Sequence, residues 1–337
     1  ILVFMKFVLA CVTRRHVAVL AFGAGFGVAA APALAAYPDK PVTLIVPFAP
    51  GGSSDIIARS ISPLLSEKLG QPVVIENVGG AGGVLGTQKA VRSAPDGYTV
   101  LLGSGSEILI NKLINPGVSY DATRDLAPVI FVGTGPMVLL GTPTLEANNV
   151  PELLKLLKAK PGSLSYGSAG NGTPMHVVGE LLKMRAGVFM THIPYRGAAP
   201  ALVDLLSGQI DMAISTIITR QQEVFMRRRT IRALAVTARE RSGTLPEVPT
   251  MVEAGVPGFD VTAWFGVAAP AKLPAAVAER LREALAALAT APDVTAAMQA
   301  QGAEPYLQQQ EHLRQFWAED AARWAKVASA AGIVLDG

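Results

Sequence analysis

The chain has 337 residues, of which half are hydrophobic and 16% are charged, with one cysteine and a formal net charge of +3. This composition excludes intrinsic disorder, because enough apolar surface is available for a core. One cysteine also excludes a disulfide framework and a cysteine-rich metal site. At roughly 100–200 residues per domain, the length indicates two domains or one large one.

The first segment, residues 1–35, has the pattern of a secretory signal peptide. Three basic residues and no acidic one precede an uncharged run from Val17 to Ala36 that is rich in small residues. Such a run could instead stay in place as a membrane anchor, since its length just spans a bilayer. Ala33 and Ala35 form a small-x-small cleavage pattern, so we expect removal of residues 1–35 and localisation in the periplasm.

The net positive charge belongs to this segment. It holds three of the 29 basic residues and none of the 26 acidic ones, so the rest of the chain has 26 of each. A balanced charge gives no basic field to attract nucleic acid. The local run of arginines at 227–229 fits a solvated helix end better than a DNA-binding patch, and no nucleic-acid partner is expected.

Short strands and amphipathic helices alternate along the remaining chain. The first strand covers residues 42–46 and is followed by a Pro/Gly-rich turn and a helix from residue 54 to 69, with apolar residues at helical spacing. Later predicted strands lie at residues 73–75, 98–102, 129–140 (broken by glycine), 164–166, 192–195, 210–214, 231–237 and 261–268. One further helix is predicted to follow the second glycine-rich turn and to end at residue 91. The other predicted helices cover residues 151–158, 174–186, 200–206, 274–289 and 311–330.

This alternation predicts an α/β fold with mostly parallel sheets flanked by helices. The chain is expected to cross between two lobes near residues 133–140 and again near 256–264. Residues 36–138 and 262–337 would then form the first lobe, and residues 139–261 the second. The aromatic face of the last helix is expected to be core packing.

Three glycine-rich turns follow predicted strands, at residues 47–55, 77–83 and 168–173. Each offers backbone N–H groups and a helix start, an arrangement that suits an anion. Each taken alone could equally be an ordinary capped turn, but three turns over both lobes favour a cleft for a small molecule with negative groups. Arg196 could pair with a carboxylate or form a surface salt bridge.

Signatures of enzymes are missing. The chain has no P-loop, no complete dinucleotide fingerprint and no nucleophile elbow, and its histidines lack metal-ligand spacing. His176 could be a neighbour of a helix cap, a ligand contact or a core histidine. Binding without chemistry is therefore the simpler account, with no catalytic residue, metal or cofactor expected.

Several stretches resemble the receptors of tripartite tricarboxylate transporters, also called the Bug family of extracytoplasmic solute receptors. They are residues 37–42, 46–52 with Asp55 and Ala58-Arg59, 76–77 with 80–83, 96–99, 166–168 with His176, 194–197, 233–237, 245–250 with 253–255, and 264–266 with 269–270. The resemblance implies a two-lobed periplasmic binding protein of the type II "Venus flytrap" kind. It also implies a small carboxylate ligand and delivery to a membrane permease with a large and a small subunit.

Carried over to this chain, the family's ligand contacts fall on the three turns and on the strand ends beside them. They would be Ser53, Ser54, Asp55, Gly80, Ala81 and Ser104 in the first lobe, and Ser168, Gly170, Asn171, Thr173 and Arg196 in the second. The protein is expected to be a monomer. Two alternatives stay open: a periplasmic enzyme acting on a carboxylate, with Ser168 and His176 as the plausible pair, or a receptor that presents its ligand to a signalling partner.

Overall fold

The computed structural model describes residues 37–215, 230–243, 245–299, 304–305, 310–330 and 333. The predicted signal peptide and the arginine run at 227–229 lie outside the described residues. The chain divides into one unit of Ile1–Tyr37 and a second unit of Pro38–Gly337. All that follows concerns the second unit, in which no described helix is long and apolar enough to cross a membrane.

Within the described residues the second unit contains two mixed sheets. The first sheet defines the first lobe and has the strand order β11 (Glu304–Pro305), β4 (Leu126–Pro136), β10 (Thr262–Pro270), β3 (Thr99–Ser104), β1 (Val42–Val46) and β2 (Val73–Asn77). The second sheet defines the second lobe, with the order β7 (Thr191–Pro194), β6 (Ser165–Ser168), β8 (Met212–Ser215), β5 (Val138–Gly141) and β9 (Arg232–Val236).

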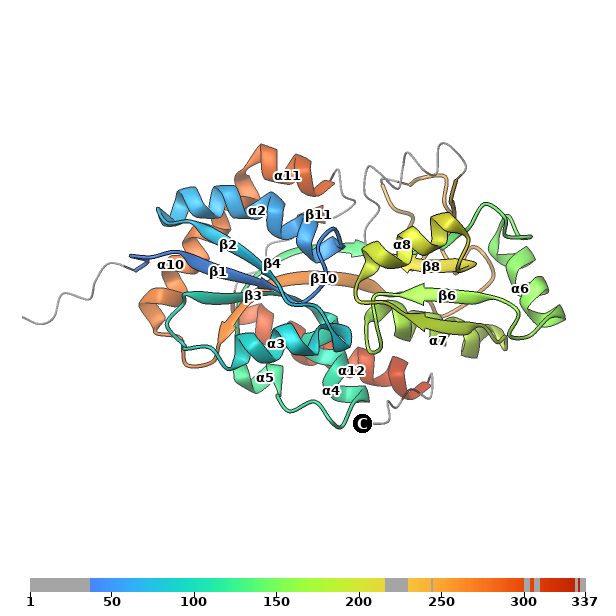
Figure 1. Ribbon diagram of the computed structural model, residues 1–337, viewed down its shortest axis with the longest axis horizontal. Coiled ribbons are helices and arrows are strands. Elements are labelled where there is room, and N and C mark those ends of the chain that lie inside the picture. Colours follow the sequence, from blue (N-terminus) through green and yellow to red (C-terminus); the bar gives the residue numbers. More distant parts are fainter. Residues whose placement is uncertain are drawn as a thin grey trace, which may run out of the picture. The chain divides into compact units, whose positions relative to one another are not determined.

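Helices cover both faces of each sheet, as Figure 1 shows. In the first lobe α2 (Ser53–Leu69) and α11 (Pro292–Gln299) lie above the strands, and α3 (Val84–Val91) and α12 (Gln310–Ala330) below them. In the second lobe α8 (Ala198–Ser207) and α7 (Pro174–Ala186) lie on opposite faces. The other helical segments are η1 (Ala81–Gly83), η2 (Ser106–Ile110), α4 (Asn111–Ile114), α5 (Ala122–Asp125), α6 (Val150–Ala159), α10 (Ala275–Ala286) and η3 (Ala287–Thr290).

Most strands of each sheet run in one direction, and two of the exceptions, β5 and β10, have a topological cause. In the first sheet β10 is antiparallel to both β3 and β4, and the two-residue β11 is antiparallel to β4, while β1 is parallel to β2 and β3. In the second sheet β5 is antiparallel to β8 and β9. β5 and β10 are the strands by which the chain enters a lobe from the other one. They therefore start at the edge where the other strands end.

Helix α2 shows how the sequence pattern becomes structure. Ile57, Ile61, Leu65 and Leu69 recur every fourth residue and are at most 4% exposed, so one face of the helix is buried against the sheet. Burying each such side chain contributes about 1.5–3 kcal/mol. The helix ends at Gly70, whose φ of 73° is the left-handed conformation that glycine adopts readily.

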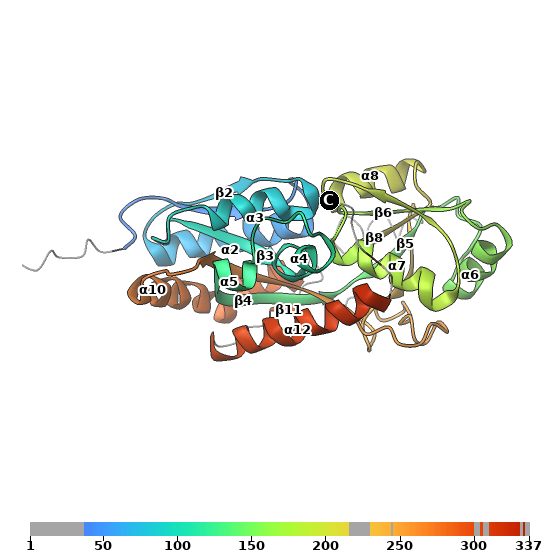
Figure 2. The same cartoon turned by 90° about the horizontal axis from the view of Figure 1, so that it is seen from below.

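The last helix, α12, joins the two lobes on the face seen in Figure 2, where it runs beneath β4 and contacts α7. Its aromatic face is core, as predicted, because Trp317 and Trp324 are at most 5% exposed. The buried Asp320 fixes its position by accepting hydrogen bonds from the indole N–H groups of Trp264 (2.6 Å) and Trp324 (3.1 Å).

The predicted two-lobed α/β fold is confirmed. The strands lie close to their expected positions, and the final helix, predicted at residues 311–330, is Gln310–Ala330. The main difference lies just after β3. There the chain forms the short π-helix η2 and continues into α4, neither of which the sequence pattern predicted. This segment places a charged residue, Glu107, inside the first lobe.

Candidate functional site

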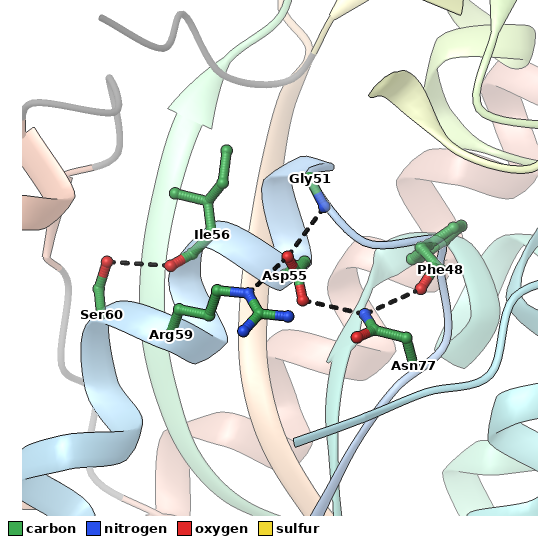
Figure 3. Close-up of polar contacts among 7 residues, drawn as sticks. All are labelled: Phe48, Gly51, Asp55, Ile56, Arg59, Ser60 and Asn77. Atoms are coloured by element: carbon green, nitrogen blue, oxygen red, sulfur yellow. Dashed lines mark hydrogen bonds and ion pairs between the residues drawn. The ribbon is translucent and has the colours of Figure 1, made fainter. Parts of the chain in front are cut away.

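The first turn, between β1 and α2, is fastened by the side chain of Asp55. Its carboxylate accepts hydrogen bonds from the Gly51 N–H (2.8 Å), Arg59 Nε (2.9 Å) and Asn77 Nδ2 (3.0 Å), as Figure 3 shows. Asn77 Nδ2 also donates to the carbonyl oxygen of Phe48 at 3.1 Å. Asp55 therefore ties the turn to its own helix and to the end of β2.

The protonation of Asp55 follows from these contacts. Burial raises the pKa of this carboxyl, but the hydrogen bonds from Arg59, Gly51 and Asn77 outweigh burial and leave the pKa below its usual value. Asp55 is therefore ionised at neutral pH. It is only 2% exposed, and its oxygens point at protein donors.

The second turn, at residues 79–83, reaches the other lobe. Ala81 has a φ of 48° and Gly82 a φ of 63°, conformations that favour residues without a bulky side chain. A Cβ atom on Gly82 would lie 2.1 Å from the carbonyl oxygen of Asn171 in the second lobe. Only glycine allows the two lobes to approach this closely here.

The third turn, at residues 168–173, is held by its own hydroxyl groups. Thr173 caps α7 by accepting from the His176 N–H at 3.4 Å, and its hydroxyl donates to the Gly170 carbonyl at 2.7 Å. The Ser168 hydroxyl exchanges hydrogen bonds with the backbone of Gly170, both 3.1 Å long. Both side chains are fully buried, so the shape of this turn is set from within.

Ser168 also has a histidine partner, His192 rather than His176. The distance from its Oγ to His192 Nε2 is 2.7 Å, and the His192 ring stacks on that of His176 with 4.1 Å between centroids. Burial lowers the pKa of His192 to about 3 and also lowers that of His176. Both rings are therefore neutral near pH 7, and Ser168 is fully buried behind the third turn.

A small cavity lies where the first and third turns meet. Its volume is about 30 Å³, which is room for a water molecule. Among the described residues, those that line the cavity come from both lobes and include no lysine, arginine, aspartate or glutamate. They are Phe48, Gly52, Ser53, Ser54, Ser104, Ser106, Ala263 and Phe265 from the first lobe, and Ala169, Thr173, Pro174, Met175 and Ala198 from the second.

The two lobes touch on either side of the cavity. The Ala49 N–H donates to the Arg196 carbonyl oxygen at 3.4 Å, and the Ser106 hydroxyl lies 3.5 Å from the carbonyl oxygen of Gly172. A Cβ atom on Gly51 would contact Ala199 at 3.6 Å. The two lobes are therefore in direct contact around the cavity.

Four of the eleven predicted contact residues line the cavity: Ser53, Ser54, Ser104 and Thr173. Those left out of the lining are Asp55, Gly80, Ala81, Ser168, Gly170, Asn171 and Arg196. Of these, Asp55, Ser168 and Gly170 support the turns, Asn171 contacts Gly82, and Arg196 is exposed and meets the first lobe through its backbone. Their role as direct ligand contacts stays a prediction.

Sequence reasoning missed the apolar part of the lining, mainly Phe48, Met175 and Phe265. Phe48 lies in the Pro47–Pro50 turn and Phe265 follows Trp264, so both stand in stretches that resemble the family. Met175 had no such signal, because a methionine at the second position of a helix looks like core. Sequence reasoning also missed Glu107, a lone charge in the apolar stretch after residue 100.

Glu107 lies directly behind the cavity wall and is fully buried. Its Oε1 accepts from the Ser104 N–H at 2.5 Å, and its Oε2 accepts from the Ser104 hydroxyl at 2.8 Å. Burial raises the pKa of this carboxyl to about 7, although the hydrogen bonds from Ser104 act in the opposite direction. A carboxyl group that titrates near neutrality is therefore connected to the cavity through one serine.

In the part of the chain that the structure describes, no group of three or more His, Cys, Asp or Glu side chains is placed to hold a metal ion. The site offers hydroxyl groups, two helix starts and apolar walls. It is suited to holding a small molecule.

Residues 57–333 match the model of the tripartite tricarboxylate transporter family receptor. The chain belongs to this family of receptors, also called the Bug family. It is 38% identical over 328 residues to the protein BugT of Bordetella pertussis, with 96% of this chain and 99% of BugT covered.

Solved structures agree with the family assignment. The structure of Rpa4515 from Rhodopseudomonas palustris with adipate is 34% identical and has a TM-score of 0.84, with 88% of this chain and 99% of that chain covered. MatC from the same organism, with bound malate, is 31% identical and has a TM-score of 0.80, with coverage of 86% and 99%. Both of these structures share the fold described above.

Proposed function

We propose that this chain is a periplasmic solute-binding receptor that captures a small organic acid as its anion and delivers it to a tripartite tricarboxylate-type permease. One observation carries the proposal: helices α2 and α7, from opposite lobes, both start at a cavity whose lining includes four serines and a threonine. Relatives in two solved structures hold adipate and malate, which are both dicarboxylates.

The electrostatics of the cavity favour an anion without fixed positive side chains. A helix start carries about half a positive charge and stabilises a nearby anion by about 0.3–1 kcal/mol, or about 2 kcal/mol where it is partly buried. Two helix starts at one cavity, one from each lobe, suit one carboxylate at each end of a short chain. The apolar walls, including Phe48, Met175 and Phe265, suit the carbon chain between them.

Binding in this proposal includes a lobe movement. The cavity of about 30 Å³ has room for a water molecule and is too small for a dicarboxylic acid. The lobes would separate about the two connections between the sheets and close again on the ligand. Lobe boundaries of 36–138 with 262–337, and 139–261, are supported by β4 ending at Pro136, β5 starting at Val138 and β10 starting at Thr262.

Ligand binding tests the proposal directly. Purified protein, freed of bound ligand by unfolding and refolding, is titrated with malate, adipate, succinate, citrate and benzoate, and its melting temperature is followed. We expect at least one acid to raise the melting temperature, with a dissociation constant in the micromolar range, or about 8 kcal/mol. If none of them shifts the melting temperature at millimolar concentration, the proposal is wrong.

A matched pair of variants tests whether the cavity is the site. Ser54→Ala removes a hydroxyl that lines the cavity and is expected to weaken binding about tenfold or more, the effect of one hydrogen bond to a charged group. Ser60→Ala removes a hydroxyl from the same helix that donates to the Ile56 carbonyl at 2.9 Å, away from the cavity. It is expected to bind like the wild type. Equal affinities of the two variants would exclude Ser54 from the site.

Delivery to a permease needs a cellular test. Uptake of the labelled acid is compared in a strain that lacks this gene and in the same strain with the gene restored. Loss of uptake in the first strain and recovery in the second are expected. Unchanged uptake, together with an altered transcriptional response to the acid, would favour the sensory alternative.

A further inference from the structure

The buried carboxyl group of Glu107 is held by hydrogen bonds from Ser104. It is fully buried, and among the described ion pairs none includes it. Both of its carboxyl oxygens are occupied by Ser104. An unpaired buried charge is costly, which points to a use for this group at the adjoining cavity.

The hydrogen bonds of Ser104 determine what the cavity presents to a guest. A serine hydroxyl has one proton to donate and two lone pairs to accept with. The Ser106 N–H lies 3.3 Å from the Ser104 oxygen and occupies one lone pair. When Glu107 is ionised, the hydroxyl proton of Ser104 is directed at Glu107 Oε2, so the cavity side is left with a lone pair, which repels a carboxylate oxygen.

Protonation of Glu107 reverses this arrangement. A proton on Oε2 makes the carboxyl the donor and the Ser104 oxygen the acceptor, while Oε1 still accepts from the Ser104 N–H. The Ser104 hydroxyl is then able to turn its own proton into the cavity and donate to a ligand carboxylate. The proton needed for this comes from the solvent, one for each ligand bound.

We propose that Glu107 acts through Ser104 as a proton-dependent selector, so that the receptor takes up one proton when it binds a carboxylate. The inference rests on the proposed function and adds to it the protonation state in which the site accepts its ligand. Glu107 is a positioning residue here, because it acts on the ligand through the Ser104 hydroxyl.

The groups around Glu107 explain why the pKa of its carboxyl group lies near neutral pH. From β3, Ser104 donates to it and Gly103 lies beside Oε1; from η1, Gly83 lies beside Oε2. The Tyr120 hydroxyl donates to its backbone oxygen at 3.0 Å. Burial and the charge of Glu107 raise the pKa of Tyr120, so this phenol is neutral. With the pKa of Glu107 itself at about 7, the selector responds near neutral pH.

Calorimetry of acid binding at several pH values tests the inference. The probes are malate and adipate, whose carboxyl groups are ionised throughout the range from about pH 6.5 to about pH 8.5. In wild type we expect the dissociation constant to rise with pH, approaching tenfold per pH unit above about pH 7. Titrations in buffers with different ionisation enthalpies are expected to report uptake of about one proton per ligand at the upper end of this range.

The variant Glu107→Gln separates this role from a structural one. Its side-chain amide is able to donate to Ser104 while its oxygen accepts from the Ser104 N–H, so it imitates the protonated carboxyl at every pH. We expect Glu107→Gln to bind the acid with an affinity that changes less than twofold over the pH range and to take up no proton. The control Glu253→Gln, which alters an exposed glutamate paired with Arg241, is expected to keep the pH dependence of the wild type.

The outcomes distinguish this inference from the proposed function. Binding by wild type that is independent of pH and takes up no proton overturns the inference and leaves the receptor function intact. Failure of wild type to bind any acid counts against both. Infrared spectroscopy gives a readout without ligand: a protonated-carboxyl band near pH 6.5 that Glu107→Gln lacks supports the inference, and an ionised Glu107 at that pH overturns it.

Discussion

Replacing Asp55 tests whether this carboxylate builds the first turn rather than holding ligand itself. In the variant Asp55→Asn an amide oxygen at the Oδ2 position can still accept from the Gly51 N–H and from Arg59 Nε, but the new NH₂ group then faces the donor Nδ2 of Asn77. Hydrogen bonds to a charged acceptor contribute about 1.5–3 kcal/mol each. The Arg59 side chain is 59% exposed, so its ion pair contributes at most about 1 kcal/mol.

From these contacts we expect Asp55→Asn to lower the free energy of unfolding by about 2–3 kcal/mol, and Asp55→Ala by about 3–5 kcal/mol because it leaves buried donors unpaired. Urea unfolding followed by circular dichroism at pH 7 measures the loss. Arg59→Met is the matched control, since it removes the exposed partner alone and is expected to cost about 1 kcal/mol or less. A loss below about 0.5 kcal/mol for Asp55→Asn would refute the reasoning.

The pH dependence gives this prediction a second readout. The folded pKa of Asp55 is lowered, so its contribution is complete above the unfolded value of about 3.9 and is lost as the pH falls through the folded value. The difference in unfolding free energy between wild type and Asp55→Asn is therefore expected to be constant above about pH 5 and to shrink at lower pH. A difference that grows on acidification would show that another group is responsible.

Two further variants test how the lobes meet and how α12 is held. Gly82→Ala places a methyl group 2.1 Å from the Asn171 carbonyl oxygen, so we expect a larger radius of gyration in solution scattering and at least tenfold weaker ligand binding. Gly70→Ala, which has a similar positive φ and nothing within 4 Å, is the control and should change neither; equal effects of the two would exclude lobe contact as the cause. Asp320→Ala leaves two buried indole N–H groups without an acceptor, and we expect a loss of about 3–5 kcal/mol in urea unfolding. The neighbouring exposed Glu319→Ala should cost less than about 0.5 kcal/mol, and a similarly small loss for Asp320→Ala would contradict the assignment.

The serine and histidine of the second lobe bear on the enzyme alternative. The pair that forms is Ser168 with His192, 2.7 Å apart, whereas the sequence suggested His176. The Ser168 hydroxyl is bound to the backbone of Gly170 and is fully buried, outside the cavity lining. These hydrogen bonds stabilise the third turn. The family to which the chain belongs consists of receptors.

Local sequence patterns were sufficient to predict most of the strands and helices. The every-fourth-residue spacing that ends at Leu69 predicted α2, and short β-branched runs beside proline or glycine turns predicted β1, β2 and β3. Both signals arise from residues near each other in the chain. η2 and α4 escaped this reasoning. The residues of η2, including Glu107, are all buried, so no polar face was present to reveal a helical period, and α4 has only four residues.

The sequence by itself determined the alternation of strands and helices, the glycine turns at the strand ends and the family of the chain. The tertiary structure alone decided which turns meet across the lobes, that Asp55 and Ser168 bind the backbone of their own turns, and that Glu107 lies against Ser104 behind the cavity. The physical reason is range: propensity and periodicity act within a few residues, whereas the contact between Gly82 and Asn171 or the burial of one carboxyl depends on segments brought together only when both sheets have formed.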